Sequence, residues 1–201
     1  MIHPDTELKF INKEGGYGVV ATKLIPKGTI TWALDKLDRV FDYNEYHAFD
    51  SVYKAILDKY CYRDCQGRNV FCWDISRYVN HSFNSSCVST AYDFEIAVRD
   101  IYPGQELTDD YGYLNVSEPF ECLKEPGSDR TIVYPDDLLN FYPIWDAKTK
   151  EAFKFFNEVN QPLFKFLTPE NARKAQLVGC KKIEMDSILK CYYNAKNDFP
   201  I

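Results

Sequence analysis

The chain has 201 residues, enough for one domain with a hydrophobic core and an appended subdomain. A content of 45% hydrophobic and 27% charged residues excludes a disordered chain, and the net charge of −6 argues against a direct nucleic-acid partner. No apolar run is long enough for a membrane span, and we expect no signal peptide. The seven cysteines form no regular pattern, so we expect reduced thiols in an intracellular protein, cytoplasmic, or nuclear if the source is eukaryotic.

Residues 7–33 predict three short strands joined by tight turns, because apolar and polar residues alternate around a Gly-rich turn and a Pro-Lys-Gly turn. A dinucleotide-binding turn requires a helix after its glycines, but a β-branched strand follows Gly18. The turn is therefore a weak phosphate cradle. It remains a candidate position for a ligand that contacts main-chain groups, because glycines have no side chain to block the approach.

Residues 44–60 have helical periodicity. Aromatic and apolar side chains recur there at spacings of three and four, and they are Tyr46, Phe49, Tyr53, Ile56 and Tyr60. This pattern predicts one helix, capped by Asp42 or Asn44, whose ring-bearing face belongs to the core rather than to a site.

The segment 77–87 contains Arg77, Asn80 and His81, followed by Asn84, Ser85 and Ser86. Such side chains compete with regular backbone hydrogen bonds, so this segment predicts an irregular turn, either a functional one or a polar surface loop. A hairpin over residues 88–99, turning near Asp93, and a second strand-turn-strand run over residues 99–107 follow it.

The character of the sequence changes after Tyr113. Residues 114–133 resemble a loop, and residues 146–159, 168–179 and 181–193 predict helices. The second of these begins with Thr168 as N-cap and Pro169 at the first helical position. We therefore expect a β-rich domain followed by a helical tail.

Three short motifs, in this order along the chain, resemble those of the SET-domain family of protein lysine methyltransferases. The turn Gly16-Tyr17-Gly18 resembles the family's Gly-x-Gly turn, and the run 77–82, Arg-Tyr-Val-Asn-His-Ser, is similar to its Arg-Phe-x-Asn-His-Ser signature. Residues 101–113, with Asp110 and Tyr111, resemble its Gly-Glu-Glu-Leu-x-x-Asp-Tyr strand. Each motif alone is weak, but the ordered set is specific. The resemblance covers about residues 7–122.

The resemblance implies an α+β fold: a SET-type β-clip of short antiparallel strands with a pseudoknot, a helical insert and a helical C-terminal tail. It places the SET domain at residues 1–122, with the insert at about 42–62, and leaves 123–201 as a helical C-terminal extension. In the pseudoknot, the Asn80 segment and the Tyr111 strand pass each other and meet around one cofactor.

The resemblance also implies site residues. Tyr111 is expected to be the catalytic tyrosine, and Asp109 and Tyr113 are expected to lie along the substrate channel. The cofactor, S-adenosylmethionine, is expected to be held by Gly16, Tyr17, Gly18, Arg77, Asn80, His81 and Phe120. The chemistry fits these residue types, because methyl transfer needs a neutral, aligned amine and little acid–base machinery beyond a hydroxyl and aromatic walls.

Two departures from the family pattern matter. Phe83 stands where many members have a zinc-binding cysteine, and no C-terminal Cys-x-Cys follows, so we expect no metal. Either the loop around Phe120 or the phenylalanines of the tail then close the lysine channel, or the tail packs behind the domain or forms a homodimer contact. The phenylalanines concerned are Phe153, Phe155, Phe156, Phe164 and Phe166.

The second departure is Asp109, since the family usually has Phe or Tyr there. As a smaller side chain it leaves room for more than one methyl group. As a carboxylate it attracts the ammonium and opposes its deprotonation, or else it faces solvent at the strand end.

The sequence therefore predicts an S-adenosylmethionine-dependent methyltransferase acting on lysine in a histone or another basic protein or peptide. The alternatives are a catalytically weak SET-like module that binds a peptide or cofactor, and a thiol- or metal-dependent enzyme using Cys61, Cys65 and Cys72. The spacings of these cysteines do not match a zinc knuckle.

Overall fold

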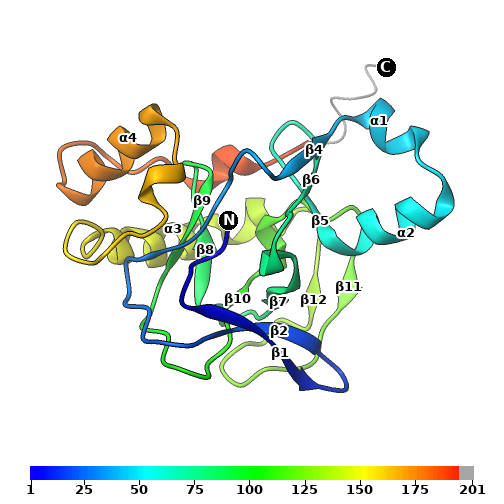
Figure 1. Ribbon diagram of the computed structural model, residues 1–201, viewed down its shortest axis with the longest axis horizontal. Helices are drawn as coiled ribbons and strands as arrows, with labels where there is room; N and C mark the ends of the chain where they lie inside the picture. Colours follow the sequence, from blue (N-terminus) through cyan, green and yellow to red (C-terminus); the bar gives the residue numbers. More distant parts are fainter. Residues whose placement is uncertain (195–201) are drawn as a thin grey trace.

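The computed structural model describes residues 1–194, in which short strands form five small sheets and helices lie at two opposite ends (Figure 1). The predicted α+β class is confirmed. The strands are β1 (Thr6–Asn12), β2 (Gly16–Ala21), β3 (Ile30–Ala33), β4 (Arg39–Phe41), β5 (Cys61–Arg63), β6 (Asn69–Phe71), β7 (Asn80–His81), β8 (Cys87–Ser89), β9 (Phe94–Ala97), β10 (Thr108–Asp109), β11 (Phe120–Glu121) and β12 (Ile132–Val133). The helices are α1 (Tyr43–Ala48), α2 (Ser51–Tyr60), α3 (Asp137–Phe153) and α4 (Pro169–Gly179), with 3₁₀ turns η1 (Ile75–Tyr78), η2 (Tyr111–Tyr113), η3 (Phe164–Phe166) and η4 (Ile188–Cys191).

The N-terminal hairpin and the central sheet agree with the sequence pattern. Strands β1 and β2 pair antiparallel, with Lys9 opposite Gly18, and β3 follows as the third predicted strand. The central sheet has the order β3-β9-β8, and the β8–β9 hairpin turns at Asp93, whose φ is +59°. All four residues of β9 are buried, which places this sheet at the middle of the core.

The predicted helix over residues 44–60 is instead two helices, because a second cap interrupts it. Asp42 caps α1, and the Asp50 carboxylate accepts the main-chain N–H groups of Val52 and Tyr53 to start α2. The ring-bearing face is also not core, which corrects the prediction: Tyr53 is 57% and Ile56 46% exposed. Both helices extend from one end of the molecule (Figure 1).

The C-terminal tail (residues 123–194) differs from its prediction at both ends. Helix α3 begins at Asp137 and ends at Phe153, so the expected helix 146–159 lies nine residues too late at its start, and the loop prediction missed the β11–β12 pair. Helix α4 agrees, with Thr168 as N-cap and Gly179 as its last residue. The helix predicted for 181–193 is wrong: Lys181 has a φ of +56°, and only η4 is helical in that range.

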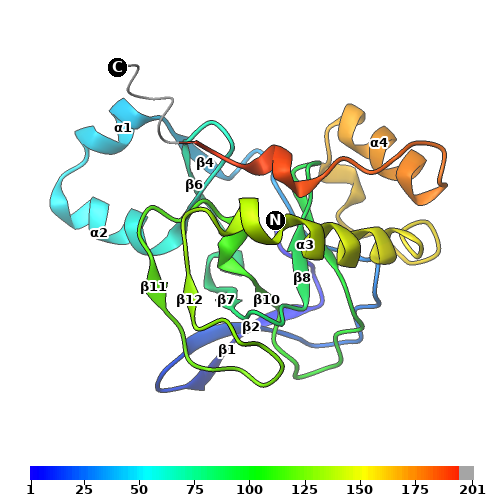
Figure 2. The same ribbon diagram turned by 180° about the vertical axis from the view of Figure 1, so that it is seen from behind.

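Residues 152–178 of the tail pack against the central sheet, at the far end of the molecule from α1 and α2, whereas β12 lies beside β11 on the side of α2 (Figures 1 and 2). Phe153 and Phe156 contact the buried face of β3 and β9 in one apolar cluster. Gln161 ties the two parts together, since its amide donates to the Gly28 carbonyl and accepts from the Ile30 N–H, both at 2.8 Å. This part of the tail therefore packs behind the β-rich part, whereas Phe120 and the tail residue Tyr193 line the cavity described below. Dimer formation stays a prediction, and residues 195–201 lie outside the described chain.

None of the helices within residues 1–194 combines the length and the apolar character that a membrane crossing requires.

Candidate active site

Two segments distant in sequence meet at the centre of the molecule. Strands β7 and β10 run parallel, with Asn80 beside Thr108 and His81 beside Asp109. The Ser82 N–H extends the pairing by donating to the Asp109 carbonyl at 2.8 Å. The 3₁₀ turn η1, capped by Asp74, delivers the chain into β7. This parallel pair, marked β7 and β10 in Figure 2, brings the second and third sequence motifs together.

Tyr111 follows β10 directly and is held at both ends. Its hydroxyl donates to the Val79 carbonyl at 2.6 Å, and its N–H donates to Nδ1 of His81 at 3.1 Å. Burial raises the pKa of the Tyr111 hydroxyl above its ordinary value and lowers the pKa of His81. The hydroxyl therefore stays protonated at neutral pH and can orient a nearby amine but not act as a base.

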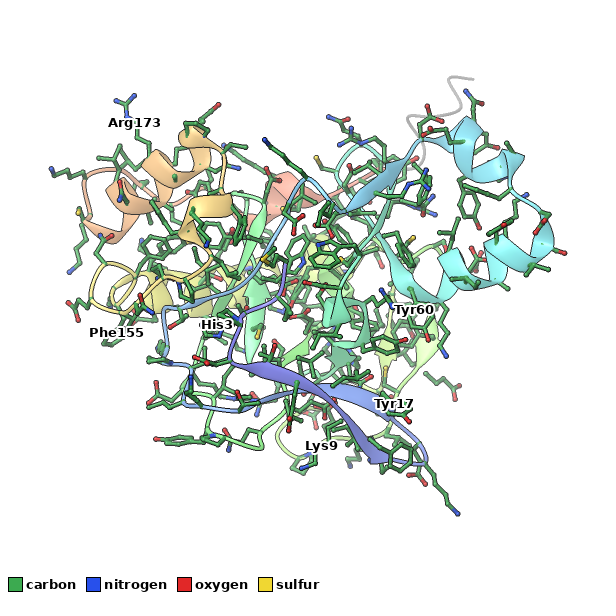
Figure 3. The ribbon with its side chains drawn as sticks, in the orientation of Figure 1. His3, Lys9, Tyr17, Tyr60, Phe155 and Arg173 are labelled. Atoms are coloured by element: carbon green, nitrogen blue, oxygen red, sulfur yellow. The ribbon has the colours of Figure 1, made fainter. Side chains whose placement is uncertain are left out.

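Asn80 connects the first motif to the third. Its amide donates to the Tyr17 carbonyl at 3.1 Å and to the Glu106 carboxyl at 2.6 Å. Gly16, with a φ of +67°, has open space where a Cβ would lie, and the Tyr17 ring beside it is 54% exposed at the edge of the hairpin (Figure 3). Main-chain groups of this turn are thus accessible to a ligand.

Gly18→Ala is expected to lower the free energy of unfolding by about 1–3 kcal/mol, the usual range for overpacking. A Cβ at Gly18 would lie 2.2 Å from the Glu106 carboxyl oxygen, 2.8 Å from Ile11 and 2.9 Å from the Asn80 amide. It would therefore break the bond between Asn80 and Glu106. Urea unfolding measures the loss against Gly15→Ala, whose added Cβ finds its nearest atom at 3.4 Å. Equal stability of the two variants would contradict this packing.

A cavity of about 630 Å³ opens between the helical insert and the paired motifs. Tyr111 and Asp109 lie on its wall, together with Phe120 and Arg77. Tyr43, Tyr46 and Tyr60 from the insert line the cavity as well. The expected site residues are thus divided between this cavity and the surface turn at Gly16-Tyr17-Gly18, with Asn80 and His81 between them.

Arg77 and Tyr113 have structural contacts that the sequence did not indicate. The Arg77 guanidinium donates to the carbonyls of residues 72–74, so it holds the turn that leads into β7; its assignment to the cofactor stays a prediction. Tyr113 is 2% exposed, does not line the cavity, and donates its hydroxyl to Asp109 at 3.0 Å. It therefore contacts Asp109 without lining the cavity, and the substrate-channel role expected for both residues stays a prediction.

Asp109 is 5% exposed, which rules out the solvent-facing alternative. It shares a hydrogen bond with Glu95 of β9, which is 9% exposed and lies on the same cavity wall. Glu95 is not among the site residues that the sequence predicted. The available signal was a single acid inside the otherwise apolar run Phe94-Glu95-Ile96-Ala97.

Phe83 occupies the position where the resemblance led us to look for a zinc ligand. Its ring lies edge-on to His81 and 4.4 Å from the guanidinium carbon of Arg130. Across residues 1–194, no three His, Cys, Asp or Glu side chains are grouped as a metal site requires. We expect elemental analysis of the purified protein to give zinc well below one equivalent; stoichiometric zinc would contradict this.

The cysteines of the thiol-enzyme alternative are poorly suited to nucleophilic chemistry. Burial raises the pKa of Cys61 to about 12 and also raises the pKa of Cys72, and a reactive cysteine requires a lowered pKa.

The family model described as the SET domain matches residues 16–112. Among solved structures, the methyltransferase domain of human histone-lysine N-methyltransferase SETMAR is 20% identical, with a TM-score of 0.44, covering 67% of this chain and 58% of that one. KRYPTONITE, solved in complex with mCHH DNA, an H3(1-15) peptide and SAH, is 20% identical, with a TM-score of 0.45, covering 66% of this chain and 30% of that one. The chain thus spans little more than half of the first of these proteins and less than a third of the second.

A search of curated protein sequences gave no match. The span of the family model begins at the Gly16 turn, contains both strands of the parallel β7–β10 pair and ends beside Tyr111. Residues 16–112 of this chain are therefore a domain of the SET family.

Proposed function

We propose that the protein is an S-adenosylmethionine-dependent methyltransferase that acts on the side-chain amine of lysine in a protein or peptide. The observation that carries this proposal is the position of Tyr111. Its hydroxyl is fixed on the Val79 carbonyl beside the β7–β10 pair, and it lies on the wall of a cavity that also has room for a long side chain.

The residues of the hairpin side fit the methyl donor. The open backbone at Gly16 and the exposed Tyr17 ring suit the methionine part, and Asn80 with the His81 main chain suits the adenine part. When bound, this cofactor supplies an electrophilic methyl group on a sulfonium. Aromatic rings near Tyr111, those of Phe120 and His81, provide faces that attract such a cation.

The cavity side fits the acceptor. Aromatic residues of the insert line this cavity and can hold the alkyl part of a lysine, and the carboxyl groups of Glu95 and Asp109 line it too. The net charge of −6 favours a basic protein segment as partner.

The alternative of a catalytically weak binding module has the same cavity but predicts no turnover. The decisive experiment adds labelled S-adenosylmethionine to the protein and a mixture of basic proteins, followed by mass spectrometry of labelled lysines. Label in lysine supports the enzyme. If no label transfers, calorimetric titration of the cofactor separates two cases: binding means that the mixture lacked the substrate, and no binding favours the interaction module.

A further inference from the structure

The cavity contains a buried pair of carboxyl groups from two different strands. Asp109 comes from β10 and Glu95 from β9, both are at most 9% exposed, and both lie on the wall that also carries Tyr111. The Tyr113 hydroxyl donates to Asp109 at 3.0 Å, and the Ser89 hydroxyl donates to Glu95 at 3.3 Å. The two acids are thus held in place by separate donors.

The pair shares a proton. Burial raises the pKa of Glu95 well above its ordinary value and also raises the pKa of Asp109, and the two groups hydrogen-bond to each other. Two buried carboxylates in contact do not both ionise readily, so at neutral pH the pair holds one proton and one negative charge. The cavity wall therefore carries a single negative charge beside Tyr111.

Two charged groups near the pair have other partners: the Met1 amino group is paired with Asp35, and Asp110 is paired with Arg130. Burial raises the pKa of the hydroxyls and thiols around the pair, so these groups are neutral at pH 7. The ionisable groups that act on the pair from the elements around it are Tyr62, Cys72, Cys87, Asp110, Tyr111, Tyr113 and the Met1 amino group.

A buried polar group of a third strand lies beside the acid pair. Trp32 lies directly opposite Glu95 in the β3–β9 pair, is 6% exposed and lines the same cavity. Among the described residues, none accepts a hydrogen bond from its indole N–H. Because buried donors are almost always paired, this indole N–H is a further polar group near the acid pair whose environment is unusual.

We propose that Asp109 receives the target ammonium group in this cavity and accepts one of its protons, while Glu95 shares and positions the negative charge. This inference rests on the proposed function and deepens it. The proton leaves nitrogen for an Asp109 oxygen, which gives a neutral amine and a neutral carboxyl pair. The amine lone pair then forms the new N–C bond while the C–S bond of the donor breaks and its electron pair stays on sulfur. The proton on the carboxyl pair returns to solvent before the next turnover.

From the sequence, an Asp109 carboxylate was expected to oppose deprotonation of the lysine ammonium. Burial of the acid pair weakens this effect. In a desolvated cavity, an ion pair loses its advantage over two neutral partners, because both charges lack hydration. A carboxyl group with a raised pKa is also a better proton acceptor at neutral pH than an ordinary one.

Asp109→Asn and Glu95→Gln test the proposal by the pH dependence of methyl transfer between pH 6 and 10. General-base catalysis contributes about 10²–10⁴-fold, so Asp109→Asn is expected to lower kcat/KM at pH 7 by at least ~100-fold. The defect should shrink as the pH approaches ~10.4, where solvent deprotonates lysine itself. Glu95→Gln should lower kcat/KM by roughly 10-fold and shift the profile, as a positioning residue would. The control is Glu151→Gln, which removes an exposed carboxylate of α3 outside the cavity.

A binding measurement keeps the ammonium site testable without turnover. Calorimetric titration with n-butylammonium at pH 7 should show at least ~10-fold weaker binding to Asp109→Asn than to the wild type, and 1-butanol should not distinguish the two proteins. Absence of methyl transfer by the wild type, with this difference intact, would reject only the proposed function. The proposal would be overturned if the wild type did not bind n-butylammonium. It would also be overturned if Asp109→Asn stayed within threefold of the wild type both in n-butylammonium affinity and in the rate of methyl transfer at every pH.

A stability profile checks the charge on Asp109 directly. Its folded-state pKa lies above that of the unfolded chain because of burial, so its contribution to stability is present below pH ~4 and is lost as the pH rises through the folded value. Asp109→Asn cannot ionise. Urea unfolding should therefore show the variant gaining stability relative to the wild type between pH 4 and pH 8, and a pH-independent difference would count against a buried, ionising Asp109.

Discussion

Tyr111→Phe is expected to lower methyl transfer by at least ~100-fold, which corresponds to about 2.7 kcal/mol of transition-state stabilisation. The hydroxyl that this substitution removes is held at 2.6 Å from the Val79 carbonyl and lies on the cavity wall. A phenyl ring fills nearly the same volume, so the loss falls on orientation of the amine and not on packing. The measurement is single-turnover transfer of labelled methyl into lysine, with cofactor affinity determined in parallel.

The control for this prediction is Tyr102→Phe, which removes a hydroxyl from a 54% exposed ring outside the cavity. Cofactor affinity should stay within about threefold in both variants, since Tyr111 belongs to the acceptor side. A Tyr111→Phe protein with wild-type transfer rates would remove the basis for the catalytic assignment. Loss of cofactor binding would instead indicate that the hydroxyl maintains the fold of the β7–β10 region.

Arg130→Met is expected to destabilise the protein by about 3–5 kcal/mol, the usual cost of leaving a buried charge without its partner. The Arg130 guanidinium bridges Asp110 and Asp137, whose side chains are 1% and 2% exposed, and its distance to Asp137 is 2.5 Å. It also lies over the rings of Phe83 and Phe141 at 4.4 and 4.2 Å. Removing it leaves two carboxylates facing each other in a dry environment.

The physical cause can be separated from lost packing. Asp110→Asn and Asp137→Asn, introduced together into Arg130→Met, should restore most of the stability, because no unpaired buried charge remains. Arg173→Met, on the exposed face of α4 (Figure 3), should change stability by less than about 0.5 kcal/mol. Urea unfolding of the four proteins measures these differences. A triple variant as unstable as Arg130→Met would assign the effect to the aromatic contacts.

Local signals in the sequence predicted the parts of the fold that depend on local chemistry. The glycine-punctuated strands β1 and β2, the turn at Asp93 and the start of α4 at Thr168 each follow from one or two residues with strong backbone preferences. The order of three motifs was sufficient to indicate the family. These features do not require knowledge of what packs against them.

Other predictions from the sequence were wrong or incomplete, and several of these errors concern contacts between residues that are distant in the sequence. The insert was predicted as one helix with a core face, but Asp50 starts a second helix, and Tyr53 and Ile56 of the ring-bearing face are exposed. The early start of α3 was hidden by Pro143, which lies inside the helix. Glu95 was missed because its importance depends on Asp109, fourteen positions away and on another strand. Contacts of this kind depend on how the strands are arranged in space, and the spacing of residues along the sequence does not indicate that arrangement.

The bond pattern of Gln161 has a consequence for how the protein can be divided. The Gln161 amide satisfies both the Gly28 carbonyl and the Ile30 N–H, and Phe153 and Phe156 cover the face of β3 and β9. The folded structure of the segment that matches the family therefore depends on the C-terminal tail, which lies outside the match. A protein truncated after residue 122 would expose the apolar face of β3 and β9 and would leave the Gly28 carbonyl and the Ile30 N–H without their partner. We expect such a protein to aggregate. The segment that matches the family model is therefore shorter than the segment that we expect to fold on its own.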